Sequence, residues 1–279
     1  WPRSSASLSD GRVGYTGGPA HDHGGSGKPS GKMYVHTDYH THTCHSDGQG
    51  TVDENAAAAV RAGLRAVGIA DHGPASLFGI GVPSLSHFAR IRREVDRARR
   101  RWPQVRILFG VEANLISLRG DLDVPEEMQN DFDFVLAGLH PYVRPLSLHD
   151  GLALGCVRLM ERLSSLPRSK ARAKNTDALI RAVYRNHIDV ITHPGYRIPV
   201  DTRALARACA EVGTALEINS SHDHITLEYV EIAAAQGATF VIGSDAHIPD
   251  RVGRFERALA LAKAAGLTPR EVLNAEDRP

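Results

Sequence analysis

The sequence predicts an α/β protein folded as a distorted, TIM-like (β/α)7 barrel. Short segments of nearly continuous apolar residues alternate about seven times with segments of helical pattern. Such strands are typical of a parallel sheet that is covered by helices. Seven to eight strands fit a closed barrel better than an open doubly wound sheet, and no GxGxxG follows the first strand to indicate a dinucleotide fold.

The first predicted strand runs over 33–39, and a helix over 51–63 follows it. Thr51 is the expected N-cap of this helix, acidic residues occupy its first turn, and Gly63 ends it. The later elements repeat the same alternation. Further strands are predicted over 64–70, 105–109, 132–137, 188–192, 215–218 and 239–242. Further helices are predicted over 85–101, 152–163, 176–186 (capped by Asn175 or Thr176), 202–212, 227–236 and 254–265, before a cap-like segment over 268–271.

Residues 1–32 differ from the rest of the chain, because they are rich in Gly, Ser and Pro and lack an apolar pattern. They predict a flexible tail, since they offer too little apolar surface to offset the entropy of ordering. His21 and His23 have no strand to aim them and are expected to be solvated. The first residue is Trp and not Met, which suggests a fragment of a longer chain.

The composition excludes several classes of protein. The 33 Lys and Arg residues nearly balance the 32 Asp and Glu residues, so no overall charge favours nucleic acid or a basic partner. The 3 cysteines lack CxxC spacing, which argues against a disulfide scaffold and predicts a reducing, cytoplasmic location. No apolar run reaches the length of a membrane span, and no secretory segment is present near the start.

Histidine is the outlier of the composition, with 15 residues, and one pair of histidines follows the first strand. His40 and His42 share one face of the extended chain, about 7 Å apart along it. Two imidazoles aimed into one space can share a divalent metal, and Asp47 in the following loop adds a carboxylate. This pair alone is weak evidence for a metal site.

The same kinds of side chain recur at the ends of later strands. In a (β/α) barrel the C-terminal ends of the strands meet at one mouth, where active sites lie. We therefore expect one cluster of metal ligands there. The candidate ligands are His40, His42, Asp47, His72, Glu112, His140, His193, Asp245 and His247.

Seven segments around these residues carry a family resemblance. They are, in chain order, DYHTHTCHSDG, GIADHG, FGVEANL, LAGLHP, VITHPGY, LEINSS and IGSDAH. From Tyr34 to about Asn274 the chain resembles the PHP (polymerase and histidinol phosphatase) superfamily. It looks most like the YcdX-type phosphatases and is also similar to the PHP domains of bacterial family-X DNA polymerases. Residues 33–279 are thus expected to form one PHP metal-dependent hydrolase domain.

The resemblance implies a distorted barrel of seven strands with two to three divalent ions, and mixed nitrogen and oxygen ligands tolerate Zn, Mn or Fe. His40 and His42 resemble the pair that binds the first metal. Glu112 resembles the carboxylate that bridges the first two metals, and Asp245 resembles a further ligand of the first.

The other candidates resemble the ligands of the second and third metals. His140 and His193 match the second site. Related proteins often have His where this chain has Asp47, so His45 remains an alternative ligand. The third site would consist of Asp47, His72 and His247.

The activity that the resemblance implies is hydrolysis of a small phosphomonoester by a metal-bridged hydroxide at a di- or trinuclear site. Glu112, Asp245 and His193 are the expected catalytic residues, and no protein nucleophile is required. A phosphate substrate also needs cations. Arg197, after HPGY, and Arg144, after LHP, are the candidate substrate-binding residues, although either is equally compatible with a surface arginine.

Several nearby residues receive a second interpretation. Asp38 is expected to form a hydrogen bond to a metal-binding histidine without binding the metal itself. Cys44 is expected to take no part in the reaction. His222 and His224 fit the pocket or a solvated loop equally well. The sequence favours core packing for His36, and it assigns no role to His87, His149 and His187.

Two other functions remain open. The first is a phosphodiesterase or 3′–5′ nuclease domain associated with a DNA polymerase, which would bind nucleic acid. The chain shows neither a separate basic patch nor aromatic platforms for bases. The second is an inactive structural PHP module, which the complete ligand set disfavours. The substrate, the metals and the oligomeric state are not determined by the sequence, since specificity depends on loops such as 73–84 and 144–151.

Overall fold

The computed structural model describes residues 32–147, 150 and 168–278. The tail predicted for residues 1–32 and the helix predicted over 152–163 therefore lie almost wholly outside the described residues. In the part of the chain that the structure describes, no helix is long and apolar enough to cross a membrane.

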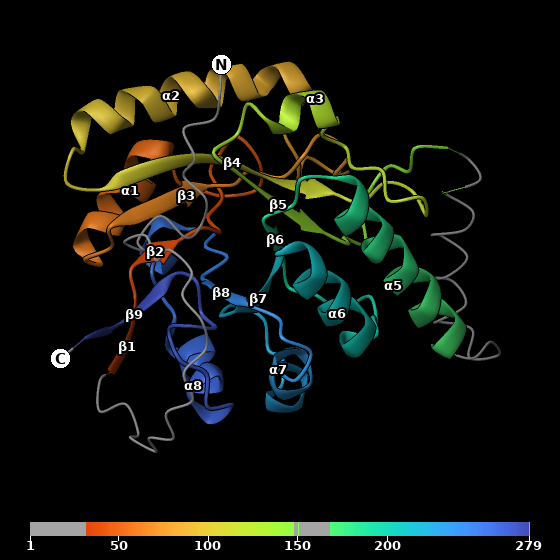
Figure 1. The fold of residues 1–279 in the computed structure, drawn as a ribbon. Helices are drawn as coiled ribbons and strands as arrows, with labels where there is room; N and C mark the ends of the chain where they lie inside the picture. The colour runs from red at the N-terminus through yellow and green to blue at the C-terminus, as the bar shows by residue number, and fades with distance from the viewer. Residues whose placement is uncertain (1–31, 148–149, 151–167, 279) are drawn as a thin grey trace, which may run out of the picture.

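Seven parallel strands form the predicted barrel, and they follow one another in chain order around the sheet (Figure 1). They are β2 (Thr37–Asp38), β3 (Ala66–Ile69), β4 (Arg106–Asn114), β5 (Phe134–Gly138), β6 (Val190–Ile191), β7 (Ala215–Asn219) and β8 (Phe240–Gly243). Every neighbouring pair is parallel. A parallel bridge between Thr41 and Ala246 brings the two ends of the sheet together, so the barrel is nearly closed.

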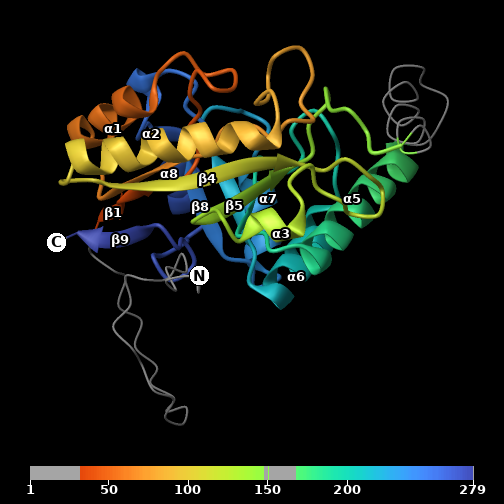
Figure 2. The ribbon, with the colours of Figure 1, turned by 90° about the horizontal axis from the view of Figure 1, so that it is seen from above.

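Helices surround this sheet on its outer face (Figures 1 and 2). They are α1 (Val52–Arg61), α2 (Phe88–Arg101), α3 (Glu126–Gln129), α5 (Arg168–Arg185), α6 (Thr202–Val212), α7 (Leu227–Ala234) and α8 (Glu256–Ala264), with 3-10 turns at Leu85–His87 and Pro249–Arg251. Local chemistry sets several of their ends. Thr51 caps α1 in a reciprocal capping box with Glu54, as predicted. Asp201 caps α6, and Gly213 ends it with a φ of 82°.

The barrel interior is filled by large side chains set against small ones. Phe134 is 1% exposed and meets Tyr39 edge to face, with ring centroids 5.3 Å apart. Gly68 and Gly110 lie beside this ring, and a Cβ at Gly110 would stand 2.2 Å from it. A larger apolar cluster lies between the sheet and the helices, because alternate strand residues face outward. The barrel is therefore a packed core, and the pocket described below lies at its C-terminal mouth.

The first predicted strand is wrong in its extent. Residues 33–39 divide into β2, which joins the barrel, and β1 (Lys32–Val35), which does not. β1 pairs antiparallel with β9 (Ala275–Arg278), a strand that was not predicted. The pattern of β9 is mostly polar because it lies at the surface, so apolar periodicity could not reveal it.

Most other boundaries differ from the predictions by one to three residues, and two differ by more. β4 continues to Asn114, so Glu112 lies within a strand and not after it. α5 begins at Arg168, and Asn175 and Thr176 are interior residues and not caps. The Thr176 hydroxyl donates to the carbonyl of Arg172 one turn back, which satisfies a polar side chain inside a helix.

Candidate functional site

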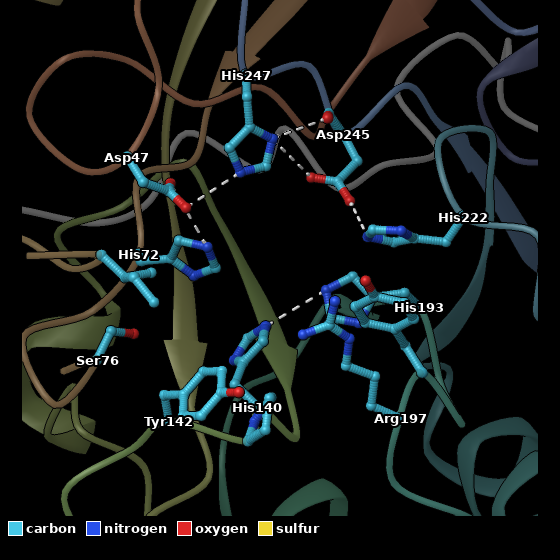
Figure 3. A pocket seen from close by; sticks show the side chains of 13 residues that line it. Asp47, His72, Ser76, His140, Tyr142, His193, Arg197, His222, Asp245 and His247 are labelled. Carbon is cyan, nitrogen blue, oxygen red and sulfur yellow. Dashed lines mark hydrogen bonds and ion pairs between the residues drawn. The ribbon is translucent and has the colours of Figure 1, made fainter. Parts of the chain in front are cut away.

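The polar side chains that follow the strands meet at the C-terminal mouth of the barrel. Six of the nine predicted ligands point into one pocket of about 220 Å³ (Figure 3), namely Asp47, His72, His140, His193, Asp245 and His247. The other three, His40, His42 and Glu112, are 0–1% exposed and lie against these six. All nine belong to groups of His, Asp and Glu that are spaced closely enough to hold metal ions.

Four side chains define the first group. His40 and His42 follow β2, Asp245 follows β8, and Glu112 comes from β4. Five distances among His40 Nε2, His42 Nε2, Asp245 Oδ1 and Glu112 Oε2 lie between 3.0 and 3.6 Å. Four ligands of a tetrahedral metal with bonds of about 2.0–2.1 Å stand about 3.3 Å apart. Five of the six distances among these atoms therefore match the spacing of ligands around one metal ion.

The second group uses the other oxygen of Glu112. Its Oε1 lies 3.1 Å from His140 Nε2 and 2.9 Å from His193 Nε2, and these two nitrogens are 3.3 Å apart. The Thr192 hydroxyl also donates to Oε1 at 2.8 Å. The carboxylate of Glu112 therefore faces two ligand groups, one with each oxygen.

The third group lies at the outer side of the pocket. Asp47 Oδ2 is 3.3 Å from His247 Nε2, and Asp47 Oδ1 is 3.8 Å from His72 Nε2. His45 points away from this group, because its ring contacts His87 and Glu94 at 3.0 Å each. The structure thus brings Asp47, and not His45, to the other candidate ligands.

Burial leaves these groups with unmet polar atoms. Glu112 is fully buried, and its Oε2 lies 2.9 Å from His72 Nδ1, but neither atom makes a hydrogen bond of good geometry within the described residues. Buried carboxylate oxygens are normally satisfied. A divalent cation would satisfy this oxygen and balance its charge, so the donor set fits a metal.

The electrostatics keep the carboxylates ionised. Burial by itself raises the pKa of Glu112, but His72, His40 and His140 outweigh it and hold that pKa well below 4.5. The pKa of Asp245 is likewise well below 3.8, because contacts with His40, His222 and His42 overcome burial. Burial lowers the pKa of His140 to about 4, so this imidazole is neutral at pH 7. Ionised carboxylates and neutral imidazoles are the forms that bind metals. At His40, His72, His193 and His247 burial lowers the pKa, but the neighbouring carboxylates outweigh it and raise the pKa, that of His247 to about 9. Metal binding would therefore displace protons from these rings.

Glu217 is a buried residue of the site that the sequence did not identify. Its Oε1 accepts a hydrogen bond from His40 Nδ1 at 2.7 Å, and its Oε2 accepts from the backbone N–H of His193 at 2.7 Å. The first bond leaves His40 Nε2 as the atom with a free lone pair. A carboxylate inside the apolar strand LEIN was the available signal. Asp38, which was predicted for this role, accepts instead from backbone N–H groups of His40, Ser244 and Gly253.

Backbone strain is concentrated at the pocket. Four non-glycine residues in the described ranges have positive φ, and three of them are His193 (26°), Arg197 (56°) and Asp245 (52°). Such conformations cost about 1–3 kcal/mol each and persist where the surroundings fix them. The fold therefore maintains unfavourable backbone geometry in order to aim these side chains.

The two candidate arginines are placed differently. Arg197 lines the pocket (Figure 3), and its guanidinium lies over the Tyr196 ring, 5.0 Å from the centroid. Arg144 is exposed and does not line the pocket.

His222 lines the pocket, with Nε2 3.1 Å from Asp245 Oδ2 and its ring stacked on Tyr196. Cys44 is exposed outside the pocket, and partial burial together with Asp71 and Glu94 raises the pKa of its thiol.

Comparisons with known proteins identify the family of the chain. A family profile described as the PHP domain matches residues 38–228. A probable phosphatase of Shewanella sp. (strain ANA-3) is 34% identical over 255 residues, which cover 87% of this chain and 88% of that protein. A probable phosphatase of Acetivibrio thermocellus is 34% identical over 249 residues, covering 85% of this chain and 90% of that protein.

Solved structures of low sequence identity share the fold. Histidinol phosphate phosphatase from Lactococcus lactis, complexed with Zn, L-histidinol and phosphate, has a TM-score of 0.60 at 18% identity. The match covers 84% of this chain and 95% of that one. A Listeria monocytogenes protein that is assigned as a histidinol phosphatase has a TM-score of 0.59 at 15% identity, over 78% of this chain and 97% of that one.

Proposed function

The chain belongs to the PHP family and is a metal-dependent phosphoesterase, and on this premise we propose that it hydrolyses a small phosphomonoester at a cluster of two to three divalent ions. The observation that carries the proposal is the carboxylate of Glu112. Each of its oxygens faces a separate set of histidine nitrogens, as a bridging ligand requires. The Lactococcus lactis enzyme, which contains Zn and phosphate on a similar barrel, supports this assignment.

The proposed ligands follow from the three groups. His40, His42, Asp245 and Glu112 would hold the first ion, and Glu112, His140 and His193 would hold the second. A third ion would be held by Asp47, His72 and His247. Mixed nitrogen and oxygen ligands suit Zn, Mn or Fe.

Divalent ions in these positions would lower the pKa of a water molecule towards neutrality and would neutralise charge on phosphoryl oxygens. The protein's own part is to position these groups. Glu112, Asp245 and His193 are the residues whose loss should abolish turnover, because they hold ligand atoms at fixed positions. The guanidinium of Arg197 would pair with the phosphoryl group at the pocket wall.

A protein nucleophile is not needed for this reaction. Ser76 lines the pocket, but its hydroxyl donates to Asn114 Oδ1 at 3.2 Å and to no base. A serine nucleophile would need a base within hydrogen-bond reach of its hydroxyl. We therefore assign water as the attacking group.

The test combines metal content with activity. Elemental analysis of the wild type should give two to three equivalents of metal, and p-nitrophenyl phosphate should be hydrolysed. Glu112→Ala should lose both metal and activity, whereas Glu271→Gln, far from the pocket and bonded to Thr268, should keep them. A wild type that stays inactive after Zn or Mn is added would refute the proposal and favour a structural module. Faster hydrolysis of the bis-ester would favour a phosphodiesterase or nuclease.

A further inference from the structure

The residues that line the pocket differ in character from one part of its edge to another (Figure 3). His222, Asp245 and Arg197 make one side polar, with the cationic group that a phosphoryl substrate needs. Tyr142 lies on the side away from Asp245 and His222, and Ile80 also lines the pocket. The reacting group and the rest of a substrate would thus meet different surroundings.

Apolar side chains continue from Tyr142 and Ile80 onto the surface of the protein. We define the apolar rim as Leu77, Phe78, Ile80 and Tyr142. The exposed fractions are 84% for Phe78, 50% for Tyr142 and 38% for Leu77. Single exposed apolar residues are common in proteins, but contiguous ones beside a pocket mark binding surfaces.

Among the residues of this rim, Phe78 combines a costly backbone conformation with the most exposed side chain. Its φ is 61°, a value that is costly for a residue with a Cβ. Its ring gains little burial in return, and it contacts the Tyr142 ring edge to face at 5.9 Å. The local conformation therefore displays an aromatic pair to solvent at the mouth of the pocket, where a ligand ring would cover it.

The backbone holds the rim in place. Leu77 N–H donates to the carbonyl of Tyr142, and Arg144 N–H donates to the carbonyl of Ala75, both at 2.8 Å. The Asp123 carboxylate accepts from Ala75 N–H at 2.9 Å behind this junction. A rim that is fixed before binding loses little entropy when a ligand is held.

We propose that the apolar rim is the subsite for the alcohol part of the substrate, and that the preferred substrates are phosphomonoesters whose alcohol carries an aromatic ring. This inference rests on the proposed phosphatase function. Tyr142 would stack on the ring of the substrate, Ile80 would contact its edge, and Phe78 would support Tyr142. Arg197 would hold the phosphoryl group on the other side of the pocket.

The test compares benzyl phosphate with ethyl phosphate, because their leaving alcohols have similar acidity and differ in the ring. The wild type should prefer benzyl phosphate about tenfold in kcat/KM, a factor that matches the energy of one aromatic pair. Tyr142→Ala should lower kcat/KM for benzyl phosphate about tenfold, mainly through KM, and should leave ethyl phosphate within about twofold. Phe78→Ala should cost benzyl phosphate about threefold.

Two controls separate the ring from other effects. Tyr142→Phe keeps the ring and should retain the preference. Tyr184→Ala removes a similarly exposed tyrosine that lies on α5 and contacts Glu211, and it should change neither ester. Equal losses for both esters in Tyr142→Ala, or a wild type without preference, would overturn the subsite.

Binding of phosphonates distinguishes failure of the subsite from failure of the phosphatase function. If neither ester is hydrolysed, titration calorimetry with benzylphosphonate and ethylphosphonate still measures the subsite. Tighter binding of benzylphosphonate that is lost in Tyr142→Ala would support the subsite while the proposed reaction fails. Equal binding of the two, or no binding of either, would refute the subsite itself.

Discussion

At the scale of single residues, function depends on side chains that the backbone aims from several strands. The sequence predicts Arg197 and Arg144 as substrate-binding residues on the same ground, since each follows a histidine-containing motif. The fold separates them, because Arg197 lines the pocket and Arg144 faces solvent. A residue-level prediction can therefore use one as the control of the other.

Arg197→Gln should raise KM for a phosphomonoester about 10- to 100-fold, because a charge-assisted bond to the phosphoryl group is worth about 1.5–3 kcal/mol. The same substitution at Arg144 should leave KM within about twofold. Steady-state kinetics with p-nitrophenyl phosphate measures both, and elemental analysis should show an unchanged metal content. Equal effects of the two variants would refute the assignment of Arg197.

Glu217→Gln should weaken metal binding about 10- to 100-fold, as loss of a partner behind a ligand histidine typically does. Gln can still accept from His40 Nδ1, but its amide N–H₂ would face the N–H donors of His193 and Asn219. Chelator competition measures the affinity. Glu231→Gln, exposed on α7, is the matched control, and an unchanged affinity in Glu217→Gln would contradict this role.

At the scale of elements, the strands need small residues where the barrel is narrow. Gly110 of β4 and Gly68 of β3 lie against the ring of Phe134 on β5. Because Phe134 is 1% exposed, it has no free space into which to move. These glycines therefore allow close packing between strands, and Gly110 lies in the strand that also carries Glu112.

Gly110→Ala should destabilise the protein by about 1–3 kcal/mol, because the added Cβ overlaps the Phe134 ring. Urea unfolding followed by circular dichroism measures the change. The double variant Gly110→Ala/Phe134→Leu should lose less stability than the sum of its two single variants, since the smaller side chain makes room. If the loss of stability in the double variant equals the sum of the two single losses, the overlap between the added Cβ and the Phe134 ring is relieved in another way.

At the scale of the whole molecule, the candidate ligands come from distant parts of the chain. His40 and Asp245 stand 3.5 Å apart although they follow the first and last strands of the barrel. An ion bound by both His40 and Asp245 would join these two segments, and it could do so only in the folded state. Metal binding and global stability should therefore be linked.

Removal of metal by a chelator should lower Tm by several degrees, and added Zn or Mn should restore it, because the ions bind the folded state preferentially. Differential scanning calorimetry measures the shift. Glu112→Ala should show a lower Tm with no further response to the chelator. A wild-type Tm that is the same with and without metal would contradict this linkage.

The lowered pKa of Glu112 determines in which direction the stability of the metal-free protein changes with pH. The pKa of Glu112 is held below 4.5 in the folded state, so its charge stabilises the fold above pH 4.5. That stabilisation is lost as the pH falls through the lowered pKa. The difference in free energy of unfolding between wild type and Glu112→Gln should therefore shrink below pH 4.5. Urea titrations at pH 3 to 7 test this, and a difference that grows towards acid would refute it.

The sequence by itself determined the barrel, the number of its strands and the order of its motifs. These follow from local physics, because apolar runs and helix caps such as Thr51 with Glu54 act over a few residues. The motif histidines and carboxylates were also visible, since nine metal-competent side chains recur at or near the ends of the predicted strands. Their roles as ligands remain a proposal that the metal analysis tests.

Only the tertiary structure decided which polar side chains meet. It brought Glu217 of β7 against His40, turned His45 towards Glu94, and placed β1 beside β9 outside the barrel. It also showed that Arg144 misses the pocket and that Phe78 and Tyr142 form an aromatic rim. These contacts join residues far apart in the chain, and their geometry depends on the twist and closure of the sheet, which no local pattern encodes.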